Sequence, residues 1–198
     1  MSDYGDLIHT ILKDNGGYIT TAQVTNASIP RRCLSELVSS GEIYKVDRGI
    51  YALPETWEDE MYFLQHRFNK GIYSHGTALY LHNLTDRTPH KYHMTTPHGY
   101  NASGARKQGI VIKAAKPELF ELGITEVASP CGNPLRVYDV ERTLCDIVRG
   151  RNADDIQLVN QAMKAYAVSN KKDIAKLFDY AENLRVKPKI LKYMEILL

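Results

Sequence analysis

Two adjacent arginines, Arg31 and Arg32, are the residues whose type and position most clearly suggest a chemistry in this sequence of 198 amino acids. A guanidinium group can donate two parallel hydrogen bonds to O6 and N7 of guanine, and it can also clamp a phosphate. The backbone N–H groups at the start of a helix favour phosphate as well. Because the arginine pair stands where a helix is expected to begin, it indicates contact with DNA. Further contacts are expected from polar and basic residues nearby, namely Thr20, Thr21, Gln23, Ser35, Lys45 and Arg48.

The arginine pair must be positioned by a helix, and the surrounding sequence predicts a helix-turn-helix. Thr20 or Thr21 can cap a short first helix, and Ser28 with Pro30 supplies the start signal of a second one. The second helix is expected to stop at Gly41, since glycine suits the left-handed conformation that follows a helix C-terminus. Its predicted apolar face contains Cys33, Leu34, Leu37 and Val38, and its polar face contains Arg31, Arg32, Ser35 and Ser39.

A hairpin is expected directly after the second helix. Short apolar runs over residues 43–46 and 50–53 are joined through Asp47, Arg48 and Gly49, where the glycine can adopt a positive φ. Helix, turn, helix and hairpin in this order predict a winged helix-turn-helix, in which one helix enters the major groove and the hairpin lies along the neighbouring backbone. A winged helix that only packs against another protein is the alternative, because fold alone does not fix function.

The length of the chain leaves room for a second core after the hairpin. We predict an α+β protein with two domains: residues 1–54 form the winged helix-turn-helix, and residues 55–198 form a mixed α/β domain with a small sheet and a helical C-terminal end. No signal peptide and no apolar run of membrane-spanning length are recognised. Three cysteines far apart in sequence suit a reducing cytoplasm and argue against a zinc ribbon or a disulfide framework.

The second domain shows the mixed pattern expected of helices and short strands. An acidic connector over residues 55–60 leads into a helix ending near Lys70, and Ser74 can cap another helix. Strands are predicted at KYHMTTP (91–97), IVIKAA (110–115) and TEVAS (125–129), with an exposed loop over 99–109. LRVYD (135–139) leads into a helix capped by Asp139, and the last fifty residues are predicted to be helical.

Charge is distributed unevenly along the chain. Residues 1–54 contain five basic and six acidic side chains, whereas residues 61–117 contain eight basic side chains against the single acid Asp86, a net charge of +7. Such a basic segment is typical of proteins that bind the phosphate backbone of DNA or RNA, although basic side chains that are merely solvated are the alternative. Supplementary phosphate contacts are expected from Arg67, Lys70, Lys91, Arg106 and Lys107.

Three histidines, His90, His93 and His98, form the strongest candidate for a metal site, because imidazole is a common zinc ligand. His90 and His93 are separated by three positions, however, which points to opposite faces of a strand. The neighbouring sequence contains neither an HExxH motif nor a pair of cysteines. We therefore predict no metal site.

Candidate catalytic groups are equally weak. Ser74 and His75 are adjacent, so their side chains diverge on a helix, and helix capping explains Ser74 more simply than a nucleophile does. Asp139 fits a helix cap, and Glu141 and Asp146 fit an exposed helix face. Because a P-loop and a dinucleotide fingerprint are also missing from the sequence, we predict no catalytic residue and no cofactor.

Four motifs in a fixed order give the chain a resemblance to a known family. They are VDRGIYALP (46–54), IYSHGTALYLHNLTD (72–86), YHMTTPHGY (92–100) and VYDVERTLCDIVRG (137–150). Together they resemble the AbiEi antitoxins of bacterial type IV toxin-antitoxin systems, which act in abortive infection and phage resistance. The resemblance covers nearly the whole chain.

The resemblance implies two roles. The winged helix would repress its own operon by binding inverted repeats in promoter DNA, and the second domain would neutralise a cognate nucleotidyltransferase-like toxin without requiring a stable complex. A cytoplasmic protein that is monomeric in solution is expected. Two alternatives remain: a ligand-responsive transcription factor whose second domain binds a metabolite, and a nucleic-acid enzyme that the winged helix targets to DNA.

Overall fold

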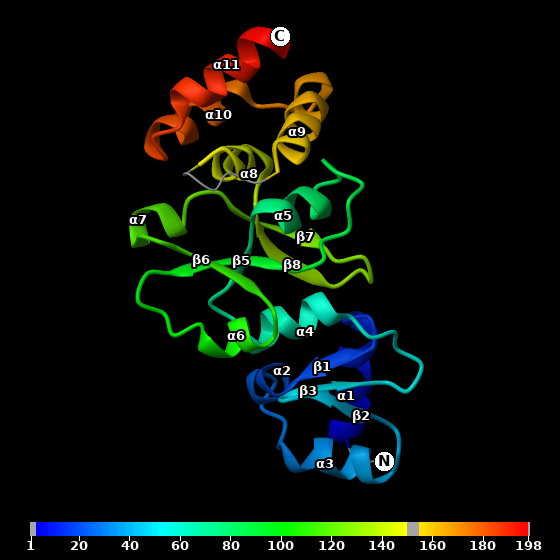
Figure 1. Ribbon diagram of the computed structural model, residues 1–198. Helices are drawn as coiled ribbons and strands as arrows, with labels where there is room; N and C mark the ends of the chain where they lie inside the picture. The colour runs from blue at the N-terminus through cyan, green and yellow to red at the C-terminus, as the bar shows by residue number, and fades with distance from the viewer. Residues whose placement is uncertain (1–2, 150–154, 198) are drawn as a thin grey trace. The chain divides into compact units, whose positions relative to one another are not determined.

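The computed structural model describes residues 3–149 and 155–197, and the chain forms two compact units (Figure 1). One unit contains Met1–Arg67 and Ala128–Pro134, and the other contains Phe68–Val127 and Leu135–Leu198. The first unit thus extends past Pro54, where the sequence predicts the domain division. Each unit combines helices with a small sheet, which confirms the predicted α+β class. No described helix is long and apolar enough to cross a membrane.

The first unit is a winged helix-turn-helix with one helix before it and one after it. Its elements are α1 (Asp3–Asp14), β1 (Tyr18–Thr20), α2 (Thr21–Asn26), α3 (Arg32–Ser39), β2 (Tyr44–Asp47), β3 (Ile50–Ala52) and α4 (Glu60–Arg67). The strands form an antiparallel sheet in the order β1-β3-β2, so that Ala52 is paired with Tyr18 on one side and with Tyr44 on the other. The sequence does not predict β1, because three residues are too few to show a strand period.

One apolar core joins the helices of the first unit. Its buried side chains are Ile8, Leu12, Ile19, Val24, Ile29, Cys33, Leu34, Leu37 and Ile43. Two expectations about α3 are wrong. Val38 is 37% exposed and not part of the core, because it lies about 100° around the helix from Leu37. Ser28 does not cap α3: it lies in the preceding turn with φ +59, and the helix begins four residues later at Arg32.

A segment distant in sequence completes the first unit. The carboxylate of Asp59 is 2% exposed, and it accepts hydrogen bonds from Ser129 Oγ and, at 2.8 Å, from Asn133 Nδ2. Ser129 Oγ in turn accepts from the backbone N–H groups of Cys131 and Asn133, both at 3.1 Å. Because a buried carboxylate is costly unless it is hydrogen-bonded, these bonds fix the segment 129–133 against the residues before α4.

The second unit contains a mixed five-stranded sheet and most of the helices. Its elements are β4 (Ile72–Tyr73), α5 (His75–Leu81), β5 (His93–Pro97), α6 (Ser103–Lys107), β6 (Val111–Ala115), α7 (Pro117–Phe120), β7 (Ile124–Ala128), β8 (Pro134–Tyr138), α8 (Val140–Ile147), α9 (Ile156–Val168), α10 (Ile174–Asn183) and α11 (Lys187–Leu197). The strand order is β6-β5-β4-β8-β7. β5 runs parallel to β6 and antiparallel to β4, and β4 runs parallel to β8.

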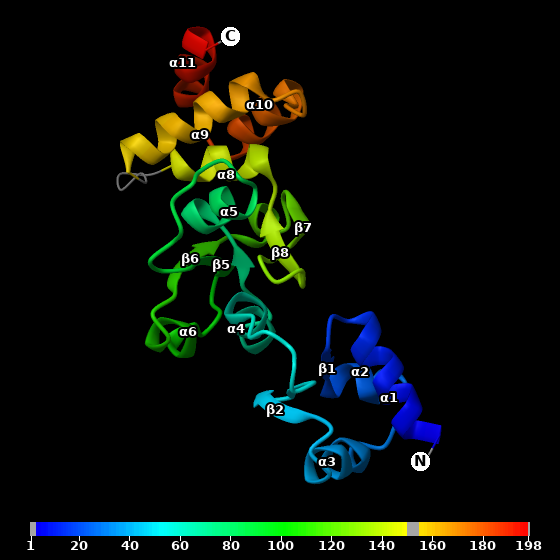
Figure 2. The same ribbon diagram turned by 90° about the vertical axis from the view of Figure 1, so that its right-hand side faces the viewer.

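Helices are stacked on one face of this sheet. Figures 1 and 2 show α5 and α8 above the strands, with α9, α10 and α11 beyond α8. The core between these helices contains Leu144, Cys145 and Ile147 from α8, together with apolar side chains from each of the three terminal helices. The predicted helical C-terminal end is therefore confirmed. The exposed loop expected over residues 99–109 is wrong in part, because α6 lies within it and buries Ala105.

The middle of α8 buries charged groups that the sequence places on an exposed face. Glu141 and Asp146 are 6% and 5% exposed, and the guanidinium of Arg142 is 1% exposed. Both predicted exposures are wrong, since α8 is covered by α5 on one side and by the terminal helices on the other. Periodicity within a single helix does not reveal such a two-sided covering.

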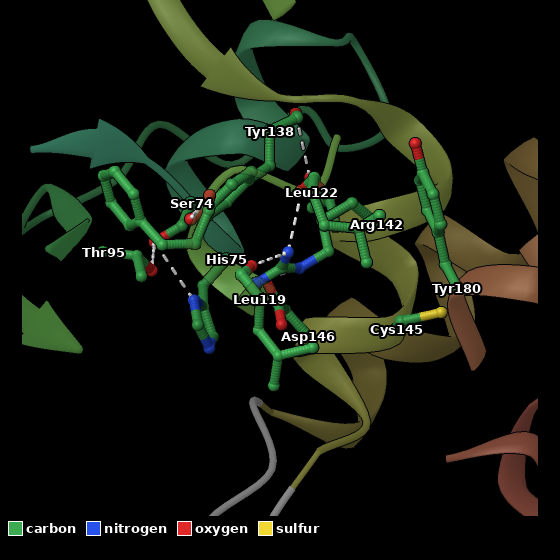
Figure 3. Close-up of polar contacts among 12 residues, drawn as sticks. Ser74, His75, Thr95, Leu119, Leu122, Tyr138, Arg142, Cys145, Asp146 and Tyr180 are labelled. Atoms are coloured by element: carbon green, nitrogen blue, oxygen red, sulfur yellow. Dashed lines mark hydrogen bonds and ion pairs between the residues drawn. The ribbon is translucent and has the colours of Figure 1, made fainter. Parts of the chain in front are cut away.

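Arg142 compensates the buried carboxylate and ties neighbouring segments together (Figure 3). Its Nε donates to Asp146 Oδ2 at 2.9 Å, and its Nη1 donates to the carbonyl oxygens of Leu119 and Leu122. The guanidinium also lies 4.2 Å from the ring centroid of Tyr138. Burial raises the pKa of Asp146, and the adjacent Arg142 acts in the opposite direction. Removal of either Arg142 or Asp146 alone would therefore lower the stability of the fold, because the remaining charge would be buried without its partner.

We expect the substitution Arg142→Met to lower the free energy of unfolding by about 3–5 kcal/mol, because it leaves the carboxylate of Asp146 buried without its cation. The double variant R142M/D146L should recover most of this loss, since an apolar pair of similar volume leaves no buried charge. Urea denaturation followed by circular dichroism measures both effects.

Arg87 provides the matched control for this prediction. It forms an ion pair with Asp155 at 2.7 Å, but both side chains are 52% exposed. Arg87→Met should therefore change stability by less than about 1 kcal/mol. Equal losses for the substitutions at Arg87 and Arg142 would contradict the role given to burial.

Candidate nucleic-acid interface

The exposed face of α3 carries the predicted arginine pair. Cys33, Leu34 and Leu37 are buried, and this stripe fixes the rotation of the helix about its axis. Arg31 at the N-cap and Arg32 in the first turn are consequently exposed, as are Ser35 and Ser39. The structure therefore brings the predicted polar residues of the second helix onto one solvent-facing surface, where they are open to a ligand.

Thr25 positions Arg31, a role that sequence reasoning missed. Arg31 Nε donates to Thr25 Oγ1 at 3.1 Å, and Thr25 Oγ1 donates to the carbonyl of Thr21 at 2.8 Å. This chain of bonds holds the Nε of Arg31 toward α2, and its terminal nitrogens form no hydrogen bond with the described residues. Arg32 makes no hydrogen bond or ion pair through its side chain with the described residues, so it is the freer of the two. The sequence signal for this role is that Thr25 stands four positions after Thr21, the spacing at which a threonine hydroxyl can bond the earlier carbonyl in a helix.

The start of α2 is a capping box. Gln23 N–H donates to Thr20 Oγ1 at 3.2 Å, and Thr20 N–H donates to Gln23 Oε1 at 2.8 Å. The Gln23 amide group also donates to Asn15 Oδ1 at 3.2 Å. Thr20 is 5% exposed, so its side chain serves the cap and it is not among the DNA contacts proposed below. Thr21 and Gln23 are half-buried and lie closer to the surface.

The hairpin between β2 and β3 forms the wing. Lys45 and Arg48 are exposed on it, as the sequence predicts for wing contacts. Gly49 adopts φ +77, and a Cβ at this position would lie 3.0 Å from Thr21 Oγ1, so both the turn and the close approach to α2 require glycine. The carbonyl of Gly49 accepts a hydrogen bond from Thr21 N–H at 2.9 Å, which joins the wing to the first helix of the helix-turn-helix.

The wing is also joined to α4 through Asp47. Asp47 Oδ1 accepts a hydrogen bond from Arg67 Nη2 in a salt bridge, and it accepts another from the backbone N–H of Arg48 at 2.6 Å. Partial burial opposes ionisation of Asp47, but these bonds outweigh it and lower the pKa of the carboxyl group. Arg67, expected to contact phosphate, therefore already has an anionic partner in this structure. Asp47 and Arg67 are twenty positions apart, so no local sequence pattern predicts that they pair.

The other four supplementary residues are exposed in the second unit. Lys70 precedes β4, and Lys91 precedes β5. Arg106 and Lys107 occupy the last turn of α6, which connects the parallel strands β5 and β6. All four side chains are open to solvent, and their contact with phosphate stays a prediction.

The histidines considered as metal ligands are not brought together. Among the described residues, no group of three or more His, Cys, Asp and Glu side chains has the geometry of a metal site. His93 instead stacks on His75, with ring centroids 6.0 Å apart and an angle of 25° between the planes. Burial, followed by the nearby positive charges of Lys113, Arg142 and Arg149 and by His93, lowers the pKa of His75 to about 3. The imidazole is therefore neutral at physiological pH.

Ser74 stands at the N-cap position of α5, but the expectation that its hydroxyl caps the helix is wrong. The residue is fully buried, and its Oγ accepts a hydrogen bond from Thr95 Oγ1 at 2.9 Å and lies 3.2 Å from His75 Nδ1 (Figure 3). The hydroxyl thus joins α5 to β5. The hydroxyl of Ser74 bonds Thr95, twenty-one residues away, instead of a backbone N–H group in the first turn of α5.

A winged helix-turn-helix with an exposed arginine pair on its second helix belongs to a class used mainly by DNA-binding regulators. Residues 6–54 match the family model described as "Transcriptional regulator, AbiEi antitoxin". This match confirms the predicted resemblance to the AbiEi antitoxins, and it covers most of α1 together with the helix-turn-helix and wing. The matched family is one of regulators and not of enzymes.

A solved structure is similar to the whole chain. The crystal structure of the RV2827C protein from Mycobacterium tuberculosis matches with a TM-score of 0.53 and 13% sequence identity, covering 98% of this chain and 78% of that one. At this identity the likeness shows the fold alone. No curated protein matches the sequence.

Proposed function

We propose that this protein is a bacterial antitoxin of the AbiEi type that represses its own promoter. The observation that carries the proposal is the exposed pair Arg31 and Arg32 at the start of α3, inside the segment that matches the regulator family. The N-terminal end of a recognition helix is where helix-turn-helix proteins contact base edges. Inverted repeats in the promoter are the proposed binding site.

The proposed interface divides the work among three elements. Arg32 and Arg31 enter the major groove from α3 together with Ser35, whereas Lys45 and Arg48 on the wing contact the neighbouring backbone. Thr21 and Gln23 at the start of α2 contact phosphate, since short polar side chains and helix N-termini are common phosphate donors. Base contacts give specificity in this arrangement, and the remaining contacts fix register.

The winged helix alone carries little positive charge for holding a polyanion, because residues 1–54 contain one more acidic than basic side chain. We propose that Lys70, Lys91, Arg106 and Lys107 of the second unit supply the missing phosphate contacts. Arg67 is left out of this set because it is paired with Asp47. The proposal explains why the basic residues are concentrated in the segment 61–117.

The second proposed role is neutralisation of a cognate nucleotidyltransferase-like toxin by residues 55–198. It rests on the family match and on the motifs that lie outside the winged helix. In a type IV system the antagonism does not require a stable complex, so a cytoplasmic protein that is monomeric in solution is compatible with it. The two roles would then be separable by substitution.

We expect R31A/R32A to abolish specific binding to the promoter of the protein's own gene. Each good base contact contributes about 1–3 kcal/mol, so loss of two should weaken binding by well over tenfold. Fluorescence anisotropy with a promoter fragment and with a scrambled duplex measures the specific part. The exposed Lys13→Ala on α1 is the control and should retain wild-type affinity. Unchanged affinity of a folded R31A/R32A variant would refute the recognition-helix assignment.

The salt dependence of binding tests the supplementary contacts. The full-length variant K70Q/K91Q/R106Q/K107Q should show a shallower plot of log affinity against log salt, by about 0.9 for each phosphate contact that is lost. The exposed pair Lys164 and Lys171 provides a control, and K164Q/K171Q should keep the wild-type slope. Equal slopes for all three proteins would confine DNA binding to the first unit.

Growth of cells that express the cognate toxin tests the second role. Full-length R31A/R32A should rescue growth while failing to repress a promoter reporter, because the substitutions lie outside residues 55–198. A fragment starting at Glu55 should rescue as well, since it retains the sheet and helices of the second unit. If R31A/R32A accumulates normally but gives no rescue, neutralisation works through DNA binding and the assignment to the second domain is wrong.

A further inference from the structure

A concave site in the second unit is lined by basic side chains from three separate parts of the chain. Its volume is about 590 Å³. Lys116 reaches it from the junction of β6 and α7, Arg149 from the end of α8, and Arg185 from the turn between α10 and α11. Glu118 and Asn183 also line it. We call this site the cationic hollow.

The three cations of the hollow are not neutralised by described residues. Lys116, Arg149 and Arg185 form no ion pair with any side chain among residues 3–149 and 155–197. Among the described residues of the lining Glu118 is the single acid, so there three positive charges face one negative charge. Like charges gathered in a concave site produce a positive potential that favours an anion.

The backbone at Arg185 is strained in a way that glycine would avoid. Arg185 follows the C-cap of α10 and adopts φ +60, the left-handed conformation that glycine usually supplies at this position. Its backbone N–H donates to the carbonyl of Glu182 at 3.0 Å. Non-glycine residues in this conformation are concentrated at functional sites. Glycine at position 185 would relieve the strain but would remove the guanidinium group that lines the hollow.

The groups on the inner side of the hollow do not cancel this charge. Burial lowers the pKa of both stacked imidazoles, and the nearby charge of Lys113 adds to this at His75 and at His93, whereas that of Arg149 acts on His75. The imidazoles are neutral in consequence. His93 Nδ1 is buried and has no hydrogen-bond partner among the described residues. The buried carboxylate of Asp146, on which Arg149 also acts electrostatically, is already paired with Arg142. The three cations of the hollow therefore keep an excess of positive charge.

We propose that the cationic hollow binds a small molecule that carries two or more phosphate groups. A guanidinium fork matches two phosphate oxygens, and two such forks with one ammonium group suit a chain of phosphates better than a carboxylate. The volume lies in the range of small-molecule sites, and a single phosphate would fill only part of it. A nucleotide and an inorganic polyphosphate share this chemistry.

The hollow is separate from the residues proposed for DNA contact. Lys70, Lys91, Arg106 and Lys107 lie outside its lining, and its concave form suits a small ligand better than the convex backbone of a duplex. The proposal therefore does not depend on promoter binding. The hollow would also be the ligand site of the alternative function, a transcription factor whose second domain binds a metabolite.

Isothermal titration of the full-length protein with tripolyphosphate, ATP, GTP and AMP tests the proposal, without DNA and at constant ionic strength. Tripolyphosphate or the nucleoside triphosphates should bind saturably and more tightly than AMP. Arg185→Gly should weaken binding by about tenfold or more, because it removes a charge-assisted contact. The same substitution should preserve or raise the unfolding temperature, since glycine suits φ +60. Loss of binding would then not be a consequence of misfolding.

Arg149→Gln provides a second variant, and the exposed Lys164→Gln is the control with wild-type affinity. Equal affinities for tripolyphosphate and ATP would identify the phosphate chain as the determinant, whereas tighter binding of ATP or GTP would identify a nucleotide. Both results support the site. Absence of saturable binding by the wild type, or equal binding by wild type, R149Q and R185G, would overturn it. The proposal would also be overturned if R149Q and R185G changed the affinity for promoter DNA but not for phosphate compounds. That result would assign these cations to DNA binding, and the proposed repressor role would be unaffected.

Discussion

The buried guanidinium of Arg142 is the group on which the architecture of the second unit depends. It neutralises Asp146 on the same helix, binds the carbonyl oxygens of Leu119 and Leu122, and covers the ring of Tyr138 at the end of β8. The partly buried carbonyl groups of Leu119 in α7 and of Leu122 after it would otherwise lose this partner, which is costly. The charge thus joins the sheet, the central helix and a connecting segment in one network, and it positions the terminal helices that pack on α8.

Much of the winged helix could be predicted because its signals are local. A capping threonine, an apolar stripe on α3 and the glycines at 41 and 49 each specify a conformation within a few residues. In the second unit β5, β6 and β7 and most of the helices were also predicted from short apolar runs, whereas the two-residue strand β4 was not. The errors arose where tertiary packing decides: α8 is buried on both sides, so Glu141 and Asp146 lie inside, and Ser74 bonds Thr95 instead of its own helix.

The candidate site shows the same division between local and distant information. Arg31 and Arg32 could be assigned to an exposed surface because helical spacing fixes which side of α3 is buried. The pairing of Arg67 with Asp47 could not, since the two residues belong to different elements and no period links them. The cationic hollow was beyond sequence reasoning altogether. Its three cations are more than thirty residues apart from one another and meet only through the packing of α7, α8 and α10.

The hydrogen bonds of Asp59 to Ser129 and Asn133 impose an order of events during protein synthesis. The helices and wing of the first unit emerge from the ribosome early, but the partners of Asp59 follow about seventy residues later. Until they arrive, this carboxylate must remain hydrated, because burial without partners is unfavourable. The nascent chain therefore passes through an interval in which α3 has been made but the surrounding unit is unfinished. Completion of the first unit is in this way coupled to translation of more than half of the 198 residues.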